Sequence, residues 1–404
     1  MLKKCTKIFF AAAVTLALFS VYVRQLVPGD MYLSKGSGLG IKSLPMVTLE
    51  QKDTVKAAAN SMQQLTYTAK LFGIIPLKTV NVSTQPGRMV SVAGTPFGIK
   101  MFSDGVMVVG FSDIQTAKGV RCPAKAAQLK PGDVIIRLNG EKVKSNADVE
   151  NHIVEKGSSP VTVTFLRDGI QMETRLVPVY DTTAGTFRTG MWVRDSSAGV
   201  GTMTFYDVQK GMFAGLGHGI KDTDTQQDIR LLSGEIVPVS IMGLTKSKNG
   251  ETGELKGTFL TDIPMGKVLA NSANGVYGTM FMPPAENMME VATPQEITTG
   301  EAYILTTING TKAKKYDIVI EKIALTSSNQ NKNLVIRITD PELLTLTGGI
   351  VQGMSGSPIV QNGRLVGAVT HVFVNQVERG YGVFAQNMLF SMDNAEKVYM
   401  NKAG

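Results

Sequence analysis

The C-terminal half of the sequence alternates apolar and polar positions in short runs that glycine or asparagine turns separate. Clear examples are residues 201–206, 235–241 and 316–323. Alternation with a period of two predicts β-strands that bury one face. Many short strands with turn residues between them are typical of β-sandwiches and β-barrels. From about residue 185 onward we therefore expect a mainly β domain.

The segment from residue 97 to about 180 has a more specific order of elements. Short strands at 97–101 and 105–110 come first. A Pro-Gly turn, a buried strand, an Asn-Gly turn, a helix from Ala147 and a closing strand at 161–167 follow them. This order resembles a PDZ domain, a module that adds an extended peptide to the edge of a sheet. The other interpretation is a small β domain that serves only as a spacer.

The resemblance to a PDZ domain implies which residues would bind the peptide. One group would line the sheet edge that holds the peptide carboxylate, and a helix would form the opposite wall. These residues are Gly98, Ile99 and Lys100 at the edge, and Val149, His152 and Ile153 on the helix.

An apolar run at residues 8–23 lies near the N-terminus, with lysines before it and Arg24 after it. It is shorter than the roughly 20 residues that span a bilayer comfortably, and a signal-peptide core has a similar length. However, no small-x-small cleavage site follows, and the run extends toward Leu26 if Arg24 snorkels. We therefore expect an uncleaved signal anchor over residues 1–27, with a cytoplasmic N-terminus and the rest of the chain outside.

Residues 28–95 carry mixed patterns. Residues 55–71 fit either a strand or a helix, whereas 79–82 and 89–92 alternate as strands do. We expect a juxtamembrane spacer that contains a small β element and carries no chemistry.

The composition excludes some classes of function. The net charge is +8, from 41 Lys and Arg against 33 Asp and Glu, without a dense basic run or a basic patch interleaved with aromatics. We therefore expect no nucleic acid partner. Cys5 and Cys122 are the two cysteines, which excludes a disulfide framework and leaves no zinc site. We expect no metal and no cofactor.

The loop at residues 353–358 is the clearest candidate for chemistry. It reads Gly-Met-Ser-Gly-Ser-Pro and is similar to the nucleophile loop of chymotrypsin-like serine proteases. A serine hydroxyl needs a base to take its proton and N–H groups to stabilise the oxyanion. Gly353 and Gly356 permit the tight backbone that points the N–H groups of Gly353 and Ser355 into one small space. The strand after Pro358 should turn at Asn362-Gly363 and return as a hairpin.

The base has to come from the three histidines of the sequence. His152 lies on the amphipathic helix, where a solvated or groove-lining role fits. His371 lies on the strand after the serine loop and either lines the substrate pocket or is a satisfied strand residue. His218 has glycines on both sides, which indicates a special backbone conformation. We expect His218 to be the base.

A carboxylate usually orients the imidazole in such a site. Asp340 and Asp262 each end an alternating strand and precede a proline turn. The order of the residues permits either of them, so the pattern leaves both open.

Several long strings resemble the sporulation stage IV protein B peptidase family, from roughly residue 97 to the C-terminus and in the N-terminal anchor. The strings are residues 193–206, 215–220, 338–341, 348–358 and 367–375. In that family the catalytic triad is His-Asp-Ser, and its positions fall on His218, Asp340 and Ser355. The resemblance therefore favours Asp340 over Asp262.

We therefore expect a mainly β protein with an N-terminal anchor, a PDZ-like domain and a chymotrypsin-like double β-barrel serine protease domain. The expected ranges are 1–27 for the anchor, 28–95 for the spacer, 96–182 for the PDZ-like domain and 183–404 for the peptidase. Gly353 and Ser355 would form the oxyanion hole. The expected activity is that of a serine endopeptidase.

The resemblance also implies a context. Such peptidases act in sporulation signalling, in the space between the mother-cell and forespore membranes. They cleave themselves and cut an extracytoplasmic segment of a membrane regulator, so that an intramembrane protease processes a sigma-factor precursor. The implied partners are this protein substrate, the chain itself, a peptide ligand of the PDZ-like domain and the membrane. The alternative is a catalytically inactive, membrane-anchored PDZ scaffold.

Overall fold

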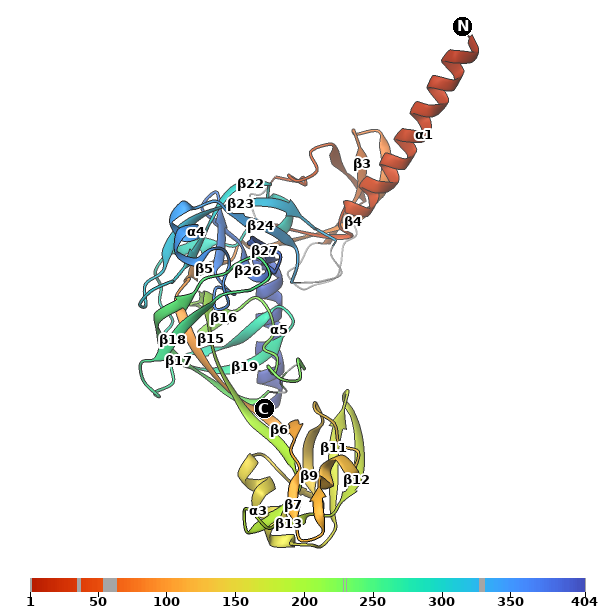
Figure 1. Cartoon of the computed structure of the whole chain (residues 1–404). Coiled ribbons are helices and arrows are strands. Elements are labelled where there is room, and N and C mark those ends of the chain that lie inside the picture. The colour runs from red at the N-terminus through yellow and green to blue at the C-terminus, as the bar shows by residue number, and fades with distance from the viewer. Residues whose placement is uncertain are drawn as a thin grey trace.

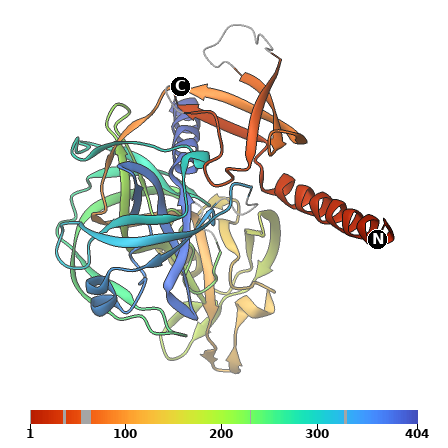
Figure 2. The same cartoon turned by 90° about the horizontal axis from the view of Figure 1, so that it is seen from above.

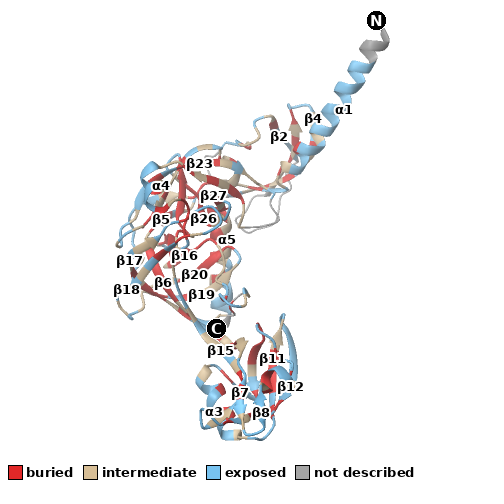
Figure 3. Cartoon of the chain, viewed as in Figure 1, coloured by how far each residue is buried: buried red, intermediate tan, exposed pale blue. Residues whose placement is uncertain are grey.

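The computed structural model describes residues 2–34, 38–53, 64–227, 229, 231–326 and 331–403. Helix α1 (Leu2–Leu26) projects from one end of the molecule, two β-barrels lie in the middle, and the region expected to be PDZ-like lies at the other end (Figure 1). Within the described residues, α1 is the one helix long and apolar enough to cross a membrane, over Lys7–Leu26. It is exposed along nearly its whole length (Figure 3).

A small four-stranded sheet follows α1 in the order β1-β4-β3-β2. Its strands are β1 (Asp30–Ser34), β2 (Val47–Asp53), β3 (Gln64–Leu71) and β4 (Ile75–Gln85). Residues 64–71, expected as strand or helix, are thus strand; residues 54–63 lie outside the described part. The last turn of α1 packs on this sheet, because Val23 of α1 and Val27 just after the helix are buried in its core. We call residues 20–85 the juxtamembrane module.

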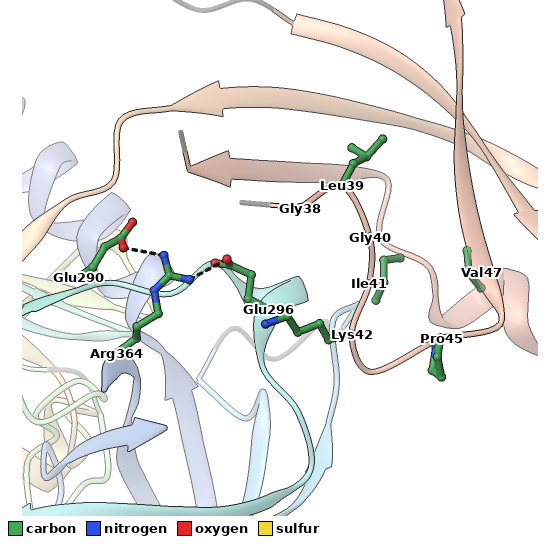
Figure 4. Close-up of a pocket in the computed structure, with 10 residues that line it drawn as sticks. All are labelled: Gly38, Leu39, Gly40, Ile41, Lys42, Pro45, Val47, Glu290, Glu296 and Arg364. Carbon is green, nitrogen blue, oxygen red and sulfur yellow. Dashed lines mark hydrogen bonds and ion pairs between the residues drawn. The ribbon is translucent and has the colours of Figure 1, made fainter. Parts of the chain in front are cut away.

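The juxtamembrane module is docked on the peptidase. The Tyr32 ring lies 4.9 Å from the Phe390 ring, and the Lys42 N–H donates to the Gln295 carbonyl at 2.8 Å. Figure 4 shows the cavity at this junction, where Arg364 forms ion pairs of 2.7 Å with both Glu290 and Glu296. Seen from above, the module and α1 extend to one side of the barrels (Figure 2).

Six strands close into a first barrel, in the order β6-β17-β19-β20-β16-β15, because β15 also pairs with β6. They are β6 (Pro96–Phe111), β15 (Met191–Asp207), β16 (Met212–Gly215), β17 (Leu231–Thr245), β19 (Gly266–Ser272) and β20 (Gly275–Met280). Beside them lie β5 (Met89–Val92), β18 (Glu254–Phe259) and β21 (Met288–Glu290).

The PDZ region is inserted into this barrel. Strands β6 and β15 pair in the barrel through Pro96↔Thr202 and then continue side by side to Phe111↔Met191 in the PDZ region. The inserted elements are β7 (Ile114–Thr116), β8 (Gly119–Arg121), α2 (Pro123–Ala126), β9 (Val134–Leu138), β10 (Glu141–Lys142), α3 (Asn146–Lys156), β11 (Val161–Arg167), β12 (Ile170–Leu176), β13 (Val179–Asp181) and β14 (Thr186–Arg188). Ser145 and Asp148 begin α3 with a capping box.

A second barrel is closed by six strands in the order β22-β23-β24-β27-β26-β25. They are β22 (Gly300–Thr306), β23 (Lys314–Ile323), β24 (Leu334–Ile338), β25 (Pro358–Gln361), β26 (Arg364–Phe373) and β27 (Gln376–Phe384). The helices are η1 (Pro294–Glu296), α4 (Pro341–Thr347) and α5 (Ala385–Ala403). As expected, β25 and β26 form a hairpin at Asn362-Gly363.

The expected fold class is confirmed: the chain is mainly β, with an apolar N-terminal helix, a PDZ domain and a two-barrel protease domain. The expected ranges 96–182 and 183–404 stay predictions. The strand pairing places the first residues of β6 in the first barrel, together with β15 and β17.

Candidate active site

Ser355 lies in the loop between α4 and β25 of the second barrel. Two glycines give this loop its shape, since Gly353 has φ +95° and Gly356 has φ +94°. A Cβ added to Gly356 would lie 2.0 Å from the Thr202 carbonyl oxygen. No other residue fits there, because both the conformation and the space exclude a side chain.

Strand β15 of the first barrel holds the serine loop. The Thr202 hydroxyl donates to the Gly353 carbonyl and the Thr204 hydroxyl donates to the Gly356 carbonyl, both at 2.7 Å. The Thr202 N–H donates to the Ser355 carbonyl at 3.1 Å. These contacts hold three peptide groups of the loop, those between residues 353 and 354, 355 and 356, and 356 and 357. The sequence analysis did not identify the two threonines, because they lie about 150 positions away and no local motif marks them.

The N–H groups of Gly353 and Ser355 are available for an oxyanion. Within the described part of the chain, neither donates a hydrogen bond to a protein acceptor. Gly353, Ser355 and His218 line one pocket of about 800 Å³. The structure therefore brings together the residues expected as nucleophile, base and oxyanion hole.

His218 reaches this pocket from the loop after β16 of the first barrel. The two residues before it have left-handed backbone conformations, which is strained for Leu216 at φ +67° and readily adopted by Gly217 at φ +69°. The Asn271 side chain holds the loop on its other side, accepting from the Ile220 N–H at 2.8 Å and donating to the Ile220 carbonyl at 2.9 Å. Asn271 is a second contributor that no local sequence pattern indicated.

The protonation of His218 follows from its hydrogen bond. Its Nδ1 lies 2.8 Å from the Gly219 carbonyl oxygen, and because a carbonyl only accepts, Nδ1 carries the proton. Nε2 is then free to accept a proton. Burial lowers the pKa of His218, and the charge of Lys221 lowers it further, against the Gly219 hydrogen bond, which raises it. His218 is therefore neutral near pH 7.

His371 lies beside His218 and lines the same pocket, with 5.0 Å between the ring centroids. Its Nδ1 is buried and has no hydrogen-bond partner among the described residues. Burial lowers the pKa of His371 to about 4, and the charges of His218, Lys332 and Lys221 act in the same direction. The sequence left two roles open for His371, a residue that lines the substrate pocket or a satisfied strand residue. The structure places His371 in the pocket.

The serine hydroxyl is held by backbone in this arrangement. Ser355 Oγ donates to the Thr370 carbonyl at 2.7 Å. Within the described residues, no imidazole accepts from it. Thr370 immediately precedes His371, so strand β26 contacts both the nucleophile and the pocket.

The structure does not bring Asp340 or Asp262 to His218. Asp340 is the N-cap of α4, and its carboxylate accepts from the Leu343 N–H at 3.0 Å. Asp262 is exposed and forms an ion pair of 2.6 Å with Lys100. In this structure the group that orients the imidazole is the Gly219 carbonyl.

The expected carboxylate-binding edge of the PDZ region is wrong at Gly98, Ile99 and Lys100. There β6 pairs with β15 on one side and with β17 on the other, so no sheet edge is open to a peptide. The cause is the length of β6, whose first residues belong to the first barrel.

The helical wall of the expected PDZ groove is only partly found. Val149 and Ile153 of α3 line a pocket of about 400 Å³, whose other side includes Phe187 and Trp192. His152 does not line this pocket. It is buried, and its Nε2 lies 3.1 Å from the Asn139 side-chain nitrogen.

The fold and the site define a two-barrel peptidase with a PDZ domain inserted into its first barrel. The family model described as SpoIVB peptidase S55 matches residues 185–389, just over half of the chain, and a PDZ domain model matches residues 100–177. The chain belongs to the SpoIVB peptidase S55 family.

Further similarities are partial. The putative zinc metalloprotease Atu1380 of Agrobacterium fabrum is 34% identical over 64 residues, which cover 16% of this chain and 17% of that protein. This chain thus spans about a sixth of that relative. The PDZ domain of the SdrC-like protein Lmo2051 from Listeria monocytogenes is 21% identical and covers 22% of this chain and 87% of its own, with a TM-score of 0.19. The Rv3671c protease in its inactive form is 13% identical, with a TM-score of 0.29. That match covers 48% of this chain and 84% of the Rv3671c structure.

Proposed function

We propose that this protein is a membrane-anchored serine endopeptidase whose nucleophile is Ser355 and whose base is His218. The observation that carries the proposal is the pocket between the barrels. It gathers a serine on a glycine-shaped loop, a neutral imidazole with a free Nε2, and two N–H groups without an acceptor among the described residues. These are the parts that acyl transfer requires.

The reaction begins when the Ser355 side chain turns from the Thr370 carbonyl to Nε2 of His218. His218 takes the hydroxyl proton while Oγ bonds to the scissile carbonyl carbon, and the Gly353 and Ser355 N–H groups donate to the oxyanion. The imidazolium then protonates the leaving amine as the C–N bond breaks. Water hydrolyses the acyl-enzyme by the same proton path and restores Ser355.

The structure supports a Ser–His dyad in which the Gly219 carbonyl fixes the tautomer of the base. A carboxylate would also stabilise the imidazolium charge, and a neutral carbonyl does so less. The family position of the third residue falls on Asp340, which caps α4 instead. The role of Asp340 is tested below by a substitution that separates capping from catalysis.

Family membership supports a role in sporulation signalling, and α1 supports attachment to a membrane. We place the peptidase outside the cytoplasm, in the space between the mother-cell and forespore membranes. Its substrates would be an extracytoplasmic segment of a membrane regulator of an intramembrane protease and the chain itself. The PDZ domain would bind a peptide ligand.

The test is a time course of the full chain in detergent, as the wild type and as Ser355→Ala, followed by intact-mass spectrometry and by labelling with a fluorophosphonate. The full chain is needed because Val23 of α1 and Val27 just after it belong to the core of the juxtamembrane module. We expect fragmentation and labelling of the wild type alone. Equal fragmentation of both proteins would remove Ser355 as the nucleophile. An unlabelled wild type would favour the inactive PDZ scaffold.

A further inference from the structure

The tip of the β3–β4 hairpin in the juxtamembrane module exposes two large apolar side chains. Phe72 is 59% exposed and Ile74 is 79% exposed. The turn between them is closed by a hydrogen bond of 3.1 Å from the Ile74 N–H to the Leu71 carbonyl. The tip is thus an ordered turn with an apolar surface.

The residue type at Phe72 is unusual for its backbone. Phe72 has φ +52° and Gly73 has φ +74°. Turns with two positive φ angles favour Asn, Asp or Gly at the first position. Three other hairpins of the chain follow this preference, with Asn139-Gly140, Asp168-Gly169 and Asn362-Gly363. At the β3–β4 tip, an aromatic ring occupies the strained position and packs on little of the protein.

The hairpin runs back along α1. Strand β4 is parallel to β1 in the register Asp30↔Asn81, and the Asn81 N–H donates to the Gly29 carbonyl at 2.8 Å. Residues of β4 before Asn81 therefore extend past the start of β1, beside the end of the helix (Figure 1). Lys78 lies two residues before Val80, which shares a core cluster with Val23 of α1, so Lys78 and Arg24 lie near the same end of the helix. Burial and, after it, the charge of Arg24 lower the pKa of Lys78.

The angle between helix and hairpin is fixed by packing. Val23 of α1 and Val27 just after it are buried in one cluster with Leu71, Val80 and Val82 of the sheet. A helix that crosses a bilayer therefore carries this hairpin with it at a set orientation.

The distance from the basic residues at the end of α1 to the hairpin tip matches the depth that surface-bound apolar groups reach in a membrane. Arg24 and Lys78 form a basic level at the end of the apolar span, where long cationic side chains lie at the phosphates. The strand continues three residues from Lys78 to Ile75, roughly 10 Å at the rise of a β-strand. Apolar groups of surface-bound elements reach about 5–10 Å into the headgroup and acyl boundary.

We propose that Phe72 and Ile74 insert into the leaflet on the peptidase side of the membrane and give the protein a second lipid contact beside α1. The proposal rests on the proposed anchoring of α1 in a bilayer. With two contacts, the helix and the tip, the module is held at a fixed tilt, and the barrels beyond it are held at a fixed height.

The experiment measures lipid contact at single positions. Trp192 is the one tryptophan of the sequence, so a Trp192→Phe background permits a reporter at one chosen site. Three full-length variants in that background carry Ile74→Trp at the tip, Phe19→Trp in α1 and Ile170→Trp in the PDZ region. Ile170 is a matched control because it is 68% exposed and directly follows the Asp168-Gly169 turn, which has the same signs of φ.

Each variant is reconstituted in vesicles of phosphatidylcholine and phosphatidylglycerol, with and without bromine on the acyl chains. We expect brominated lipid to quench Ile74→Trp and Phe19→Trp, and to leave Ile170→Trp at its unbrominated emission. If brominated lipid quenches Phe19→Trp but not Ile74→Trp, the proposed tip contact is wrong, while the anchoring of α1 in the bilayer is retained. Unquenched Phe19→Trp would overturn the anchoring itself. Equal quenching of Ile170→Trp would indicate adsorption of the whole surface and overturn a specific tip contact.

A second variant separates lipid contact from folding. Phe72→Asn places the preferred residue at the positive φ, so we expect a higher thermal midpoint in detergent and weaker quenching of Ile74→Trp in vesicles. A lower midpoint would show that the ring stabilises the protein itself, and unchanged quenching would show that it does not contact lipid. Either result would overturn the role of Phe72.

Discussion

At the scale of the residue, the site depends on hydroxyl groups that take no part in the chemistry. The Thr202 and Thr204 hydroxyls each donate to a carbonyl of the serine loop, on either side of Ser355. The Gly353 carbonyl belongs to the peptide group between Gly353 and Met354, which lies between the peptide groups that carry the Gly353 N–H and the Ser355 N–H. By holding this middle peptide group, Thr202 is a positioning residue for the oxyanion hole.

We predict that Thr202→Val lowers kcat by about 10²–10³, the loss typical of removing one oxyanion donor, with little change in KM. The reason is that the Gly353 carbonyl loses its donor and the loop is free to turn. Thr202→Ser keeps the hydroxyl and should recover most of the rate. The measurement is steady-state hydrolysis of a peptide substrate. If serine is no better than valine at this position, the hydroxyl is not the group that acts.

Asp340 gives a second prediction, because Asn caps a helix about as well as Asp does. If Asp340 acts only as the N-cap of α4, Asp340→Asn keeps the activity of the wild type and Asp340→Ala loses about 1 kcal/mol of stability. If Asp340 orients His218, Asp340→Asn loses about 10⁴ in kcat. The structure predicts the first result. Turnover and the denaturation midpoint of both variants decide between the two.

The third prediction concerns pH. His218 must be neutral to act as a base, so kcat/KM falls as the pH drops through its pKa. Burial, with Lys221, holds the pKa of His218 below its ordinary value of 6.5, which places the acid limb below pH 6.5. Lys221→Gln removes a charge that disfavours the imidazolium and should move this limb to higher pH. Lys332→Gln is the control, since Lys332 lines the same pocket but acts on His371.

At the scale of the element, β6 and β15 connect the peptidase to the PDZ region as a two-stranded stalk. The stalk has a bulge on β6, because the register shifts from Arg194↔Met107 to Ser196↔Phe102. In this bulge Gly105 has φ +111°, and a Cβ at Gly105 would lie 2.7 Å from the Ile135 carbonyl oxygen. The bulge therefore depends on this glycine.

We predict that Gly105→Ala destabilises the PDZ region by strain of about 1–3 kcal/mol and by crowding of a similar size. Gly119→Ala is the matched control, because Gly119 has φ +98° but nothing within 4 Å of an added Cβ. It should show the strain alone. The free energy of unfolding of both variants is measured by denaturant unfolding, followed by the fluorescence of Trp192, which lies on β15 in the stalk. If the two variants lose the same stability, the space around Gly105 is not limiting.

Local patterns were enough to predict much of this architecture. The serine loop, its hairpin at Asn362-Gly363 and the special backbone before His218 all follow from residues adjacent in the sequence. The pairing of β6 with β15 and β17 does not, because a period of two says which face is buried but not which strand lies alongside. For the same reason the sequence did not indicate the roles of Thr202 and Asn271, because the residues that they contact are distant in the sequence.

At the scale of the whole molecule, helix α1 and the PDZ region lie at opposite ends with the two barrels between them (Figure 1). Neither end is joined to the barrels by a loose tether. The module docks through contacts such as Tyr32 on Phe390, and the PDZ region continues two barrel strands. Since β15 also carries Thr202, the strand that extends into the PDZ region is the strand that holds the serine loop.

The burial of Val23 and Val27 in the juxtamembrane module has a consequence for shedding from the membrane. A cut directly after Val27 would release the protein but would remove both side chains from a small core. A cut that frees the peptidase with its own cores whole has to fall between β4, which ends at Gln85, and β5, which begins at Met89. The diffusible form of this enzyme would then begin close to Arg88, whose ion pairs with Asp207 and Asp393 secure the new end to the barrels.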